Sequence, residues 1–299
     1  MIKKRYINRL RVAPGKKVRL ADYPTSWAEI KELKEAGKEA VRKRADEVLD
    51  ASRASLAGAQ ELLYASDMYS VLIILQGMDT AGKDGTIKHV MSGVNPQGCR
   101  VTSFKVPTSE ENDHNFLWRY SKALPARGEI GVFNRSYYED VLVVRVHPEI
   151  LEGQQLPPGK RGNRFWNARY EDIVGFEQHL ARNGTLILKF FLHISKDEQK
   201  RRLEERLENQ EKFWKFSLSD LAERQYWDQY QKAYEMMLSR SSTDYAPWYI
   251  IPADNKWAAR TLVADTISTG IQKLDLSYPE ISPEGMQELE KARVQLMTE

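Results

Sequence analysis

A glycine-rich stretch, Leu75–His89 ("LQGMDTAGKDGTIKH"), has the spacing of a phosphate-binding loop. Four residues separate Gly77 from Gly82, and Lys83 follows directly. Glycines let the backbone wrap a phosphate with its N–H groups, and the lysine adds a positive charge. The N-terminus of a helix expected from about Asp84 also favours anions. We therefore expect a phosphate to be bound by the loop and the start of this helix: Gly77, Ala81, Gly82, Lys83, Asp84, Gly85 and Thr86.

The loop departs from the usual pattern at the position that binds Mg²⁺. Asp84 stands where a serine or threonine normally follows the lysine, and Thr86 is displaced by two positions. Asp79 places a carboxylate inside the loop, and Mg²⁺ prefers carboxylate and phosphate oxygens. We expect Asp79 to bind the metal, because an unshielded carboxylate would repel the substrate. Two alternatives are a turn residue that bonds local N–H groups and a group that orients the attacking oxygen.

A second set of candidates follows the apolar run "IGVFN" at 130–134. Asn134 stands where many P-loop enzymes have an acidic metal ligand, and it can offer a metal only a neutral carbonyl oxygen. Arg135 would emerge near the loop, where its planar guanidinium can bind phosphate oxygens. Glu139 could supply the missing charge or contact the acceptor. Three further basic residues are expected to contact phosphate: Lys88, Arg119 and Arg127.

The segment 196–215 is highly charged, with seven basic and six acidic residues. On a helix, Arg202 and Arg206 would share one face because they are four positions apart. Together with Lys212 and Lys215, they could close over phosphates as a lid. The alternative is a surface helix with many salt bridges and no ligand.

Five short apolar runs predict the strands that position these residues: 70–76, 100–104, 130–134, 185–193 and 248–252. Such runs are typical of parallel strands buried on both faces. Helical stretches alternate with them. One runs from Ser26 to about Ser66 with a Leu49, Leu56, Leu63 stripe, and Gly37 and Gly58 are expected to break or weaken it. Two others begin at the capping patterns of Thr108 and Ser195, and a last amphipathic helix is expected from Ser282, with Pro283 in its first turn. The pattern indicates a three-layer α/β/α fold with a five-stranded parallel sheet, in which ligands bind at the carboxyl ends of the strands.

Six motifs in order resemble the polyphosphate kinase 2 family: "GMDTAGKDG", "FKVPT", "FLWRY", "FNRSYYE", "VVRVHP" and "KFWKFSLSD…YWDQY". The resemblance covers about residues 70–265. It implies a P-loop kinase fold related to thymidylate kinases, with a helical lid at about 195–240. It also implies reversible phosphoryl transfer between inorganic polyphosphate and nucleotides with Mg²⁺ or Mn²⁺, and a homodimer or homotetramer.

The resemblance matches Asp79, Lys83 and Arg135 to the family's loop aspartate, loop lysine and the arginine after the strand, which implies catalytic roles for them. Many members have aspartate where this chain has Asn134, so the expected metal ligands are Asp79 and the neutral amide oxygen of Asn134, with Glu139 as the alternative second ligand. It places Arg202, Arg206, Lys212 and Lys215 in the basic lid. Asn134 and the pair Tyr138–Glu139 resemble the subgroup that accepts nucleoside mono- and diphosphates.

Length and composition limit the domain organisation and the location that the protein can have. The 299 residues are expected to form one domain, with a basic arm and helical extension at 1–69, a core at 70–265 and a helical tail at 266–299. One cysteine and the lack of a long apolar run predict a cytoplasmic protein outside the membrane. The first nineteen residues hold eight basic side chains and no acid. That arm suits either a polyanion or plain solvation.

Two other functions are alternatives to the polyphosphate kinase hypothesis. An ATP-dependent nucleoside monophosphate or small-molecule kinase could use the same fold, although Asp84 in place of the hydroxyl argues against it. A non-catalytic polyanion or nucleic-acid binder could use the basic arm. The net charge of only +3 and the lack of a nucleic-acid motif argue against that binder, and no nucleic-acid partner is expected.

Overall fold

The computed structural model describes residues 2 and 4–299, without the side chains of Lys4 and Lys215. Its centre is a parallel sheet in the order β2-β3-β1-β4-β5. The strands are β1 (Ser70–Gln76), β2 (Cys99–Ser103), β3 (Ile130–Asn134), β4 (Thr185–His193) and β5 (Trp248–Pro252). The five-stranded parallel sheet predicted from the apolar runs is confirmed, with β2 shifted by one residue.

The sheet register brings the candidate residues to one edge. Every residue of β1 and β3 is buried, as their unbroken apolar runs predict. Leu75 of β1 lies beside Asn134 of β3, and Asn134 lies beside Ser103 of β2. The carboxyl ends of these three strands therefore meet, and the segments that follow them lie together.

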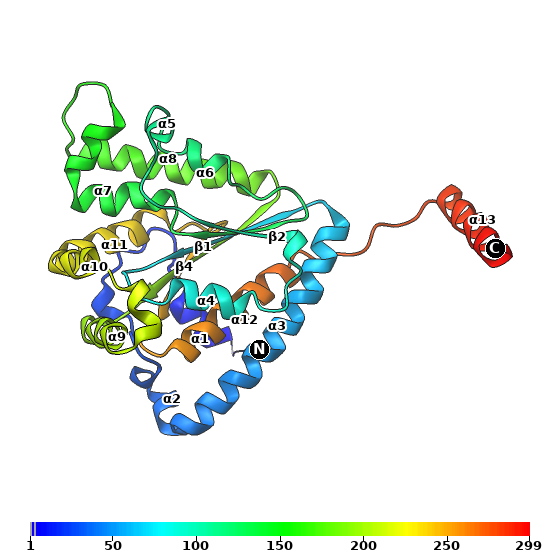
Figure 1. The fold of residues 1–299 in the computed structure, drawn as a ribbon, viewed down its shortest axis with the longest axis horizontal. Coiled ribbons are helices and arrows are strands. Elements are labelled where there is room, and N and C mark those ends of the chain that lie inside the picture. Colours follow the sequence, from blue (N-terminus) through cyan, green and yellow to red (C-terminus); the bar gives the residue numbers. More distant parts are fainter. Residues whose placement is uncertain (1, 3) are drawn as a thin grey trace.

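Helices cover both faces of the sheet (Figure 1). One layer contains α3 (Lys38–Ser66), α4 (Lys83–Val90) and α12 (Lys256–Gln272), with the 3-10 helix η3 (Pro96–Gly98). The other contains α8 (Asn163–Arg182) and α11 (Trp227–Ser241), with η4 (Tyr137–Val141), α7 (Val143–Val146) and η5 (Pro148–Gln154). This confirms the predicted three-layer α/β/α architecture.

The long N-terminal helix differs in detail from its prediction. Gly37, with a φ of +83°, separates α2 (Lys31–Ala36) from α3, whereas α3 runs through Gly58 without a break. A short 3-10 helix, η2 (Trp27–Glu29), begins at the Ser26 cap. The leucine stripe of α3 is buried against the body, as predicted.

The helix expected after Thr108 is two short helices instead of one. Thr108 and Glu111 form the predicted capping box, but α5 (Ser109–Asn112) ends after one turn and α6 (Trp118–Ser121) follows separately. Ser195 caps α9 (Lys196–Glu208), as expected. After α9 the chain forms η6 (Gln210–Lys215), α10 (Leu218–Glu223) and η7 (Arg224–Tyr226) before α11.

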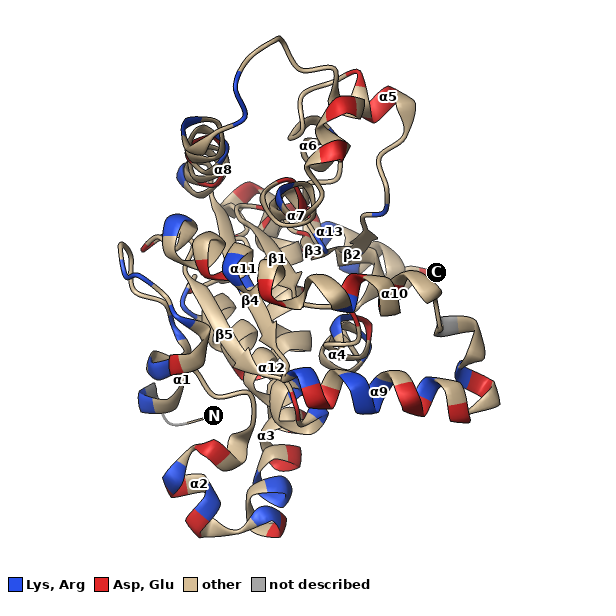
Figure 2. Ribbon diagram, turned by 90° about the vertical axis from the view of Figure 1, so that its left-hand side faces the viewer, with Lys and Arg blue, Asp and Glu red and all other residues tan. Residues whose placement is uncertain are grey.

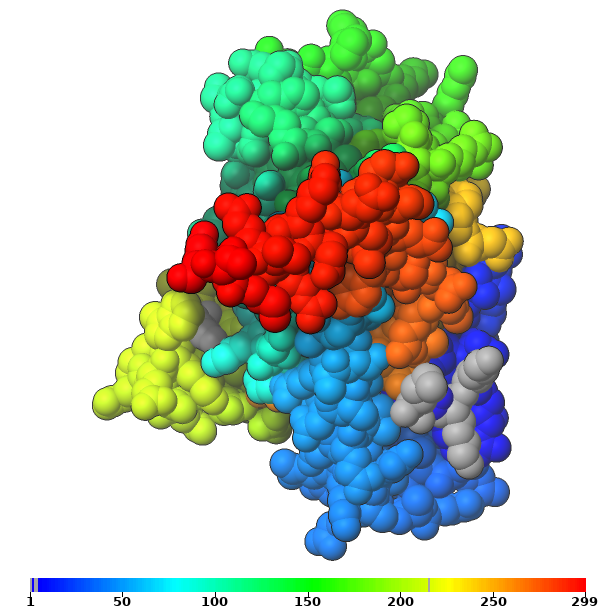
Figure 3. Space-filling view, turned by 90° about the vertical axis from the view of Figure 1, so that its right-hand side faces the viewer, coloured from blue at the N-terminus to red at the C-terminus, as the bar shows by residue number. Residues whose placement is uncertain are grey.

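The two terminal segments behave differently. After α1 (Lys4–Leu10), the N-terminal segment runs along β5, with a bridge between Arg11 and Tyr249, and it buries Val12 and Val18 before η1 (Leu20–Asp22). The C-terminal α13 (Pro283–Thr298) buries none of its residues and stands apart from the body in Figure 1. Figure 3, viewed from that side, shows this segment (red) in front of the rest of the molecule. Within the described chain, no helix has the length and apolar character needed to cross a bilayer.

Candidate functional site

A cleft of about 500 Å³ lies at the carboxyl edge of the sheet, above the loop between β1 and α4. It brings together most of the residues that the sequence predicted: Asp79, Ala81, Gly82, Lys83, Asp84, Gly85, Thr86, Asn134, Arg135, Arg202, Arg206 and Lys212. These residues come from the loop and the start of α4, from the end of β3, and from α9 and η6. The cleft is thus the place where a phosphate group can meet several positive charges at once.

The loop is held in shape by side chains that bind its carbonyl oxygens. Lys83 Nζ donates to Gly77 O at 2.7 Å and to Met78 O at 3.2 Å. Gln199 Nε2 donates to Asp79 O at 3.1 Å, and the guanidinium of Arg202 donates to the next two carbonyls. Five consecutive carbonyls are therefore satisfied. The first N–H groups of α4 have no partner within the helix and remain available to an anion.

Two glycines are required by the geometry of the loop. A Cβ at Gly77 would lie 2.9 Å from the carbonyl oxygen of Leu192, so no side chain fits there. Gly82 has a φ of +103°, in the left-handed region that other residues rarely adopt. The glycine spacing seen in the sequence thus reflects backbone packing as well as room for a phosphate.

Lys83 is buried beside Arg135. Burial lowers the pKa of Lys83 to about 8, and the neighbouring Arg135 adds to the effect, while Asp79 and Glu139 oppose it. A lowered lysine pKa means that nearby negative charges do not fully offset the desolvation of the protonated amine. A bound phosphate would relieve that cost.

Arg135 joins the loop to the end of β3. Its Nη2 lies 2.5 Å from Asp79 Oδ1, and its Nη1 lies 3.2 Å from Glu139 Oε2. Glu139 and then Asp79 raise the pKa of Arg135, while burial opposes them. The Asp79 carboxylate thus faces a guanidinium across the cleft, which is not the contact expected of a turn residue that bonds local N–H groups.

Asn134 and Asp84 form a pair that sequence reasoning missed. Asn134 Nδ2 donates to Asp84 Oδ1 at 2.6 Å and to Ser103 Oγ at 3.3 Å. Where many P-loop proteins place a hydroxyl on the helix and a carboxylate on the strand, this chain places a carboxylate on the helix and an amide on the strand. Compared with those proteins, the negative charge remains in the cleft but lies on α4 instead of at the end of the strand.

These oxygen atoms fit a hard divalent cation. Asn134 Oδ1 is buried and has no hydrogen-bond partner among the described residues, and the carboxylates of Asp79 and Asp84 line the same cleft. In the described part of the chain, no three acidic, histidine or cysteine side chains form a metal cluster. An ion here would therefore be shared between a few protein oxygens and substrate phosphates, as Mg²⁺ usually is.

The contacts of Arg202 contradict its predicted role as a phosphate ligand. A guanidinium has five N–H donors. In Arg202, Nε donates to Glu198, Nη1 to Thr80 O and Ala81 O, and Nη2 to Ala253 O and Asp254 O. All five donors are used, so Arg202 cannot also bind phosphate as predicted. It fixes the loop in place instead.

Arg206 and Lys212 lie where a lid would close. Arg206 Nη1 is 2.9 Å from Asp220 Oδ2, and both side chains are partly exposed. Lys212 pairs with Glu205. Figure 2 shows basic and acidic residues along the length of α9. The outer face carries ion pairs such as Lys200–Glu204, so the alternative of a salt-bridged surface helix holds for that face.

Several predicted contacts are not brought into the cleft. Arg127 binds the carbonyl of Met68, before β1, at the opposite edge of the sheet. Because Arg127 precedes β3 whereas the cleft residues follow strands, it cannot reach the loop. Lys88 is exposed on α4 outside the cleft. Arg119 is buried against Phe104 and pairs with Glu111 at 3.2 Å.

The two remaining predicted residues have different outcomes. Glu139 contacts Arg135 but does not line the cleft. The side chain of Lys215 lies outside the described residues.

The structure adds three basic residues to the cleft: Lys105, Lys256 and Arg260. Burial lowers the pKa of Arg260, and Arg53 and Arg202 add to the effect; its buried Nε has no partner in the described structure. Lys105 follows β2, and the other two follow β5. The rule that residues after parallel strands meet at one edge could have identified them.

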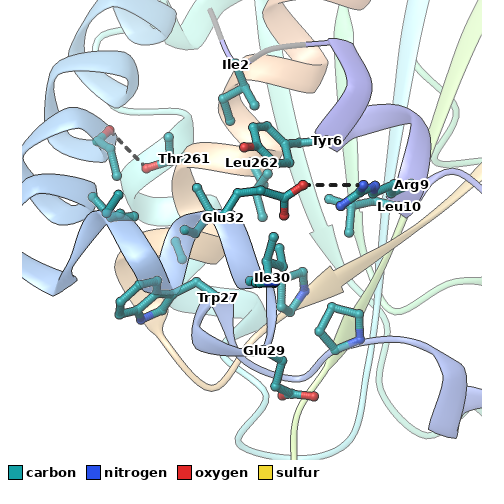
Figure 4. Close-up of a pocket in the computed structure, with 18 of the residues that line it drawn as sticks. Ile2, Tyr6, Arg9, Leu10, Trp27, Glu29, Ile30, Glu32, Thr261 and Leu262 are labelled. Carbon is teal, nitrogen blue, oxygen red and sulfur yellow. Dashed lines mark hydrogen bonds and ion pairs between the residues drawn. The ribbon is translucent and has the colours of Figure 1, made fainter.

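A larger hollow of about 1340 Å³ lies elsewhere, between α1, the start of α2, α3 and α12 (Figure 4). Its walls include Tyr6, Trp27, Ile30 and Leu262, and Glu32 in it pairs with Arg9 at 3.5 Å. It contains none of the loop residues. The phosphate chemistry therefore belongs to the smaller cleft.

Comparison with known proteins gives a consistent result. A family model described as Polyphosphate kinase 2 matches residues 39–278. The chain is 51% identical over 288 residues to an ADP-polyphosphate phosphotransferase of Rhodopseudomonas palustris, covering 96% of this chain and 97% of that protein. It is 49% identical to an AMP/ADP-polyphosphate phosphotransferase of Meiothermus ruber, covering 82% and 86%. The crystal structure of a polyphosphate kinase 2 from Arthrobacter aurescens superposes with a TM-score of 0.82 at 40% identity, covering 95% of each chain.

Proposed function

The chain belongs to the polyphosphate kinase 2 family, and from this premise we propose that it transfers a terminal phosphoryl group reversibly between inorganic polyphosphate and nucleotides. The nucleotide acceptors are AMP, which becomes ADP, and ADP, which becomes ATP. The names of its similar relatives support this substrate class. The observation that carries the proposal is the convergence of Lys83 and Arg135 on a loop whose carbonyls are already satisfied.

The chemistry asks little covalent help from the protein. An oxygen of the acceptor's terminal phosphate bonds to the transferred phosphorus, and the bond from that phosphorus to the bridging oxygen of the polyphosphate breaks. The protein must align these oxygens and neutralise the charge on the transferred group. Lys83 and Arg135 supply the positive charge, and the N–H groups at the start of α4 bind the oxygens.

We propose that a divalent cation, Mg²⁺ or Mn²⁺, is held by Asp79 and by the free amide oxygen of Asn134. Two observations support this assignment: Asn134 Oδ1 has no hydrogen-bond partner in the part of the chain that the structure describes, and carboxylates line the cleft. The ion supplies further charge neutralisation on the phosphate oxygens. Asp84 fixes the Asn134 side chain by accepting its N–H.

The remaining length of the polyphosphate needs positive charge beyond the reaction centre. Lys105, Lys256 and Arg260 line the same cleft, and Arg206 and Lys212 approach it from the lid. We assign the distal phosphates to these five residues. Donor and product contain the same kind of phosphoanhydride bond, so the reaction runs in either direction with concentration.

The test is a donor and acceptor matrix on the purified chain with Mg²⁺. We expect ATP from ADP, and ADP from AMP, when polyphosphate is the donor. Lys83→Met should abolish turnover, whereas Arg127→Ala, at the opposite edge, should retain it. If AMP is phosphorylated by ATP and polyphosphate is ignored, the chain is a nucleoside monophosphate kinase and the proposal is wrong.

We also propose that the chain forms a homodimer or homotetramer. Helix α13 supports this, because it buries no residue and exposes Met286, Leu289 and Leu296. An isolated helix of this length is marginal in water, so contact with another copy would stabilise it. Light scattering should give a multiple of 34.6 kDa; a mass of one chain contradicts the proposal.

A further inference from the structure

Two buried tyrosines, Tyr137 and Tyr138, lie two and three positions after Arg135 along the chain. Tyr137 and Tyr138 have no exposed surface, and both hydroxyls donate to the same oxygen of Glu177 in α8. The distances to Glu177 Oε1 are 2.9 Å and 2.8 Å. One carboxylate therefore holds the chain on the C-terminal side of Arg135.

The carboxylate of Glu177 is itself paired with a buried lysine. Lys189 Nζ of β4 donates to Glu177 Oε2 at 2.6 Å, to Tyr138 Oη at 2.9 Å and to the carbonyl of Ser241 at 2.7 Å. Both charged side chains have no solvent exposure. Burial raises the pKa of Glu177 and lowers the pKa of Lys189, and their mutual attraction opposes both shifts.

A buried ion pair needs an explanation beyond stability. Well-packed apolar residues of similar volume are often as stable or more stable, because two desolvated charges are costly. Such a pair can instead specify one geometry, because all of its hydrogen bonds are satisfied in a single arrangement of the side chains. Here that arrangement fixes the positions of two consecutive tyrosines.

The segment that the pair holds contains a strained residue. Arg135 has a φ of +67°, a left-handed conformation that is rare for a residue with a side chain. Ser136 next to it accepts a hydrogen bond from Gln76 Nε2 of β1 at 3.1 Å. The turn is thus attached to β1 at Ser136 and to α8 at the tyrosines, and strained residues persist where surrounding contacts determine them.

We propose that Glu177 and Lys189 are positioning residues for phosphoryl transfer, acting through Tyr137 and Tyr138 to hold Arg135 in its left-handed conformation. This inference rests on the proposed function. In this conformation Arg135 directs its guanidinium toward Asp79 and Glu139 in and beside the cleft. A turn that relaxes to an ordinary backbone conformation would move the guanidinium away from the transferred group.

The main test variant is the double substitution Tyr137→Phe with Tyr138→Phe, which removes two hydroxyls and keeps the ring packing. We expect kcat to fall about tenfold or more, because small misplacements of catalytic groups are costly, while KM for ADP stays within about twofold. Amide exchange across 134–139 should become faster. Tyr170→Phe is the matched control, since it removes a buried hydroxyl from α8 and leaves the bonds to Glu177 intact.

A double-mutant cycle separates positioning from general stability. In an Arg135→Ala background, the tyrosine substitutions should cause little further loss of kcat, because their effect acts through Arg135. The same cycle is run with Glu177→Gln combined with Lys189→Met, which removes both buried charges together. An equal loss of kcat in both backgrounds, or an unchanged kcat with only a lower melting temperature, overturns the positioning role.

The proposed function and the positioning role of Glu177 and Lys189 can be contradicted separately. If the unmodified chain does not use polyphosphate, the proposed function fails at the first assay, and the positioning role fails with it. If the unmodified chain turns over normally and the tyrosine variant matches it in kcat, the positioning role alone is wrong.

Discussion

Two of the arginines of α9, Arg202 and Arg206, share one face of the helix but make different kinds of contact. Arg202 and Arg206 are one helical turn apart on one face. Arg202 is buried, and four backbone carbonyls and Glu198 use all of its donors. Arg206 is partly exposed and pairs with the Asp220 carboxylate, also partly exposed. The first half of α9 therefore supports the phosphate loop, whereas the second half begins the segment that is predicted to form a lid.

The difference shows how one residue type can serve as scaffold or as ligand contact. Removing a buried, fully bonded guanidinium leaves the carbonyls that it bound without donors, which is costly. A partly exposed ion pair is worth little, so its arginine can exchange a carboxylate for a phosphate. If the predicted lid closes, we expect movement only beyond about Arg206. Substitutions at Arg202, Arg206 and Asp220 test this division, and the pH dependence of Lys83 tests the loop that Arg202 supports; the effects are given from the largest to the smallest.

Replacing Arg202 should damage both fold and catalysis. We expect Arg202→Ala to lower the free energy of unfolding by about 3 kcal/mol, because several carbonyls of the loop lose their donor. We expect kcat to fall by about 10²-fold or more, because the loop loses its shape. Urea unfolding and steady-state kinetics measure the two effects. A variant with normal stability and a raised KM alone would show that Arg202 binds substrate instead.

The pH dependence of kcat/KM should report Lys83. Its pKa in the folded protein is about 8, below the ordinary 10.5. Only the protonated form neutralises phosphate, so kcat/KM should fall about tenfold per pH unit above pH 8. Bound phosphate favours the charged form, so the fall in kcat should occur at higher pH.

Stability should change in the opposite direction over the same range. Between about pH 8 and 10.5 the unfolded chain binds more protons at Lys83 than the folded chain does. The contribution of Lys83 to the free energy of unfolding therefore rises with pH in this window. Thermal melts at matched pH distinguish titration of Lys83 from unfolding. A flat kcat/KM profile up to pH 10 would contradict the buried position of Lys83.

Replacing Arg206 should affect binding and leave the fold intact. We expect Arg206→Ala to raise KM for polyphosphate about tenfold, the loss of one charge-assisted contact of about 1.4 kcal/mol. The free energy of unfolding should change by less than about 1 kcal/mol. If instead the variant unfolds as readily as Arg202→Ala, the division of α9 into scaffold and lid is wrong.

The smallest effect is expected at Asp220, and it has the opposite sign. Burial raises the pKa of Asp220, and Asp79 adds to the effect, so this carboxylate is already in an unfavourable place. Asp220→Asn removes a competitor for Arg206 and should lower KM for polyphosphate about threefold. A higher KM, measured in the same assay, would mean that Asp220 helps substrate binding.

Much of the fold could be predicted because its signals are local. The five strands are short apolar runs, and the caps at Thr108, Ser195 and Ser282 depend on neighbouring residues only. The failures involve contacts between distant segments. Helix α5 ends after one turn despite a correct capping box, and α3 passes through Gly58 because packing against α12 outweighs a weak local preference.

The candidate site was predictable to the same degree. The loop glycines, Lys83, Asp79 and Arg135 follow from spacing and from their position after a strand. Lys105, Lys256 and Arg260 were missed because no spacing motif marks them; only their position after strands that share one edge of the sheet could have indicated them. Arg127 was assigned in error because it is close to Arg135 in the sequence. Strand β3 lies between the two residues and places them at opposite edges of the sheet.

The sequence by itself determined the parallel sheet, the phosphate loop and the identity of the charged groups near it, because periodicity and turn chemistry act over a few residues. Only the tertiary structure decided which of those groups is free to act. Arg202 loses its donors to carbonyls 51 to 122 positions away, and the Asp84 carboxylate is bound by an amide 50 positions away. Hydrogen-bond donors are saturated one at a time by whichever acceptor the fold brings near. Whether an arginine serves as scaffold or ligand contact is therefore settled by three-dimensional packing.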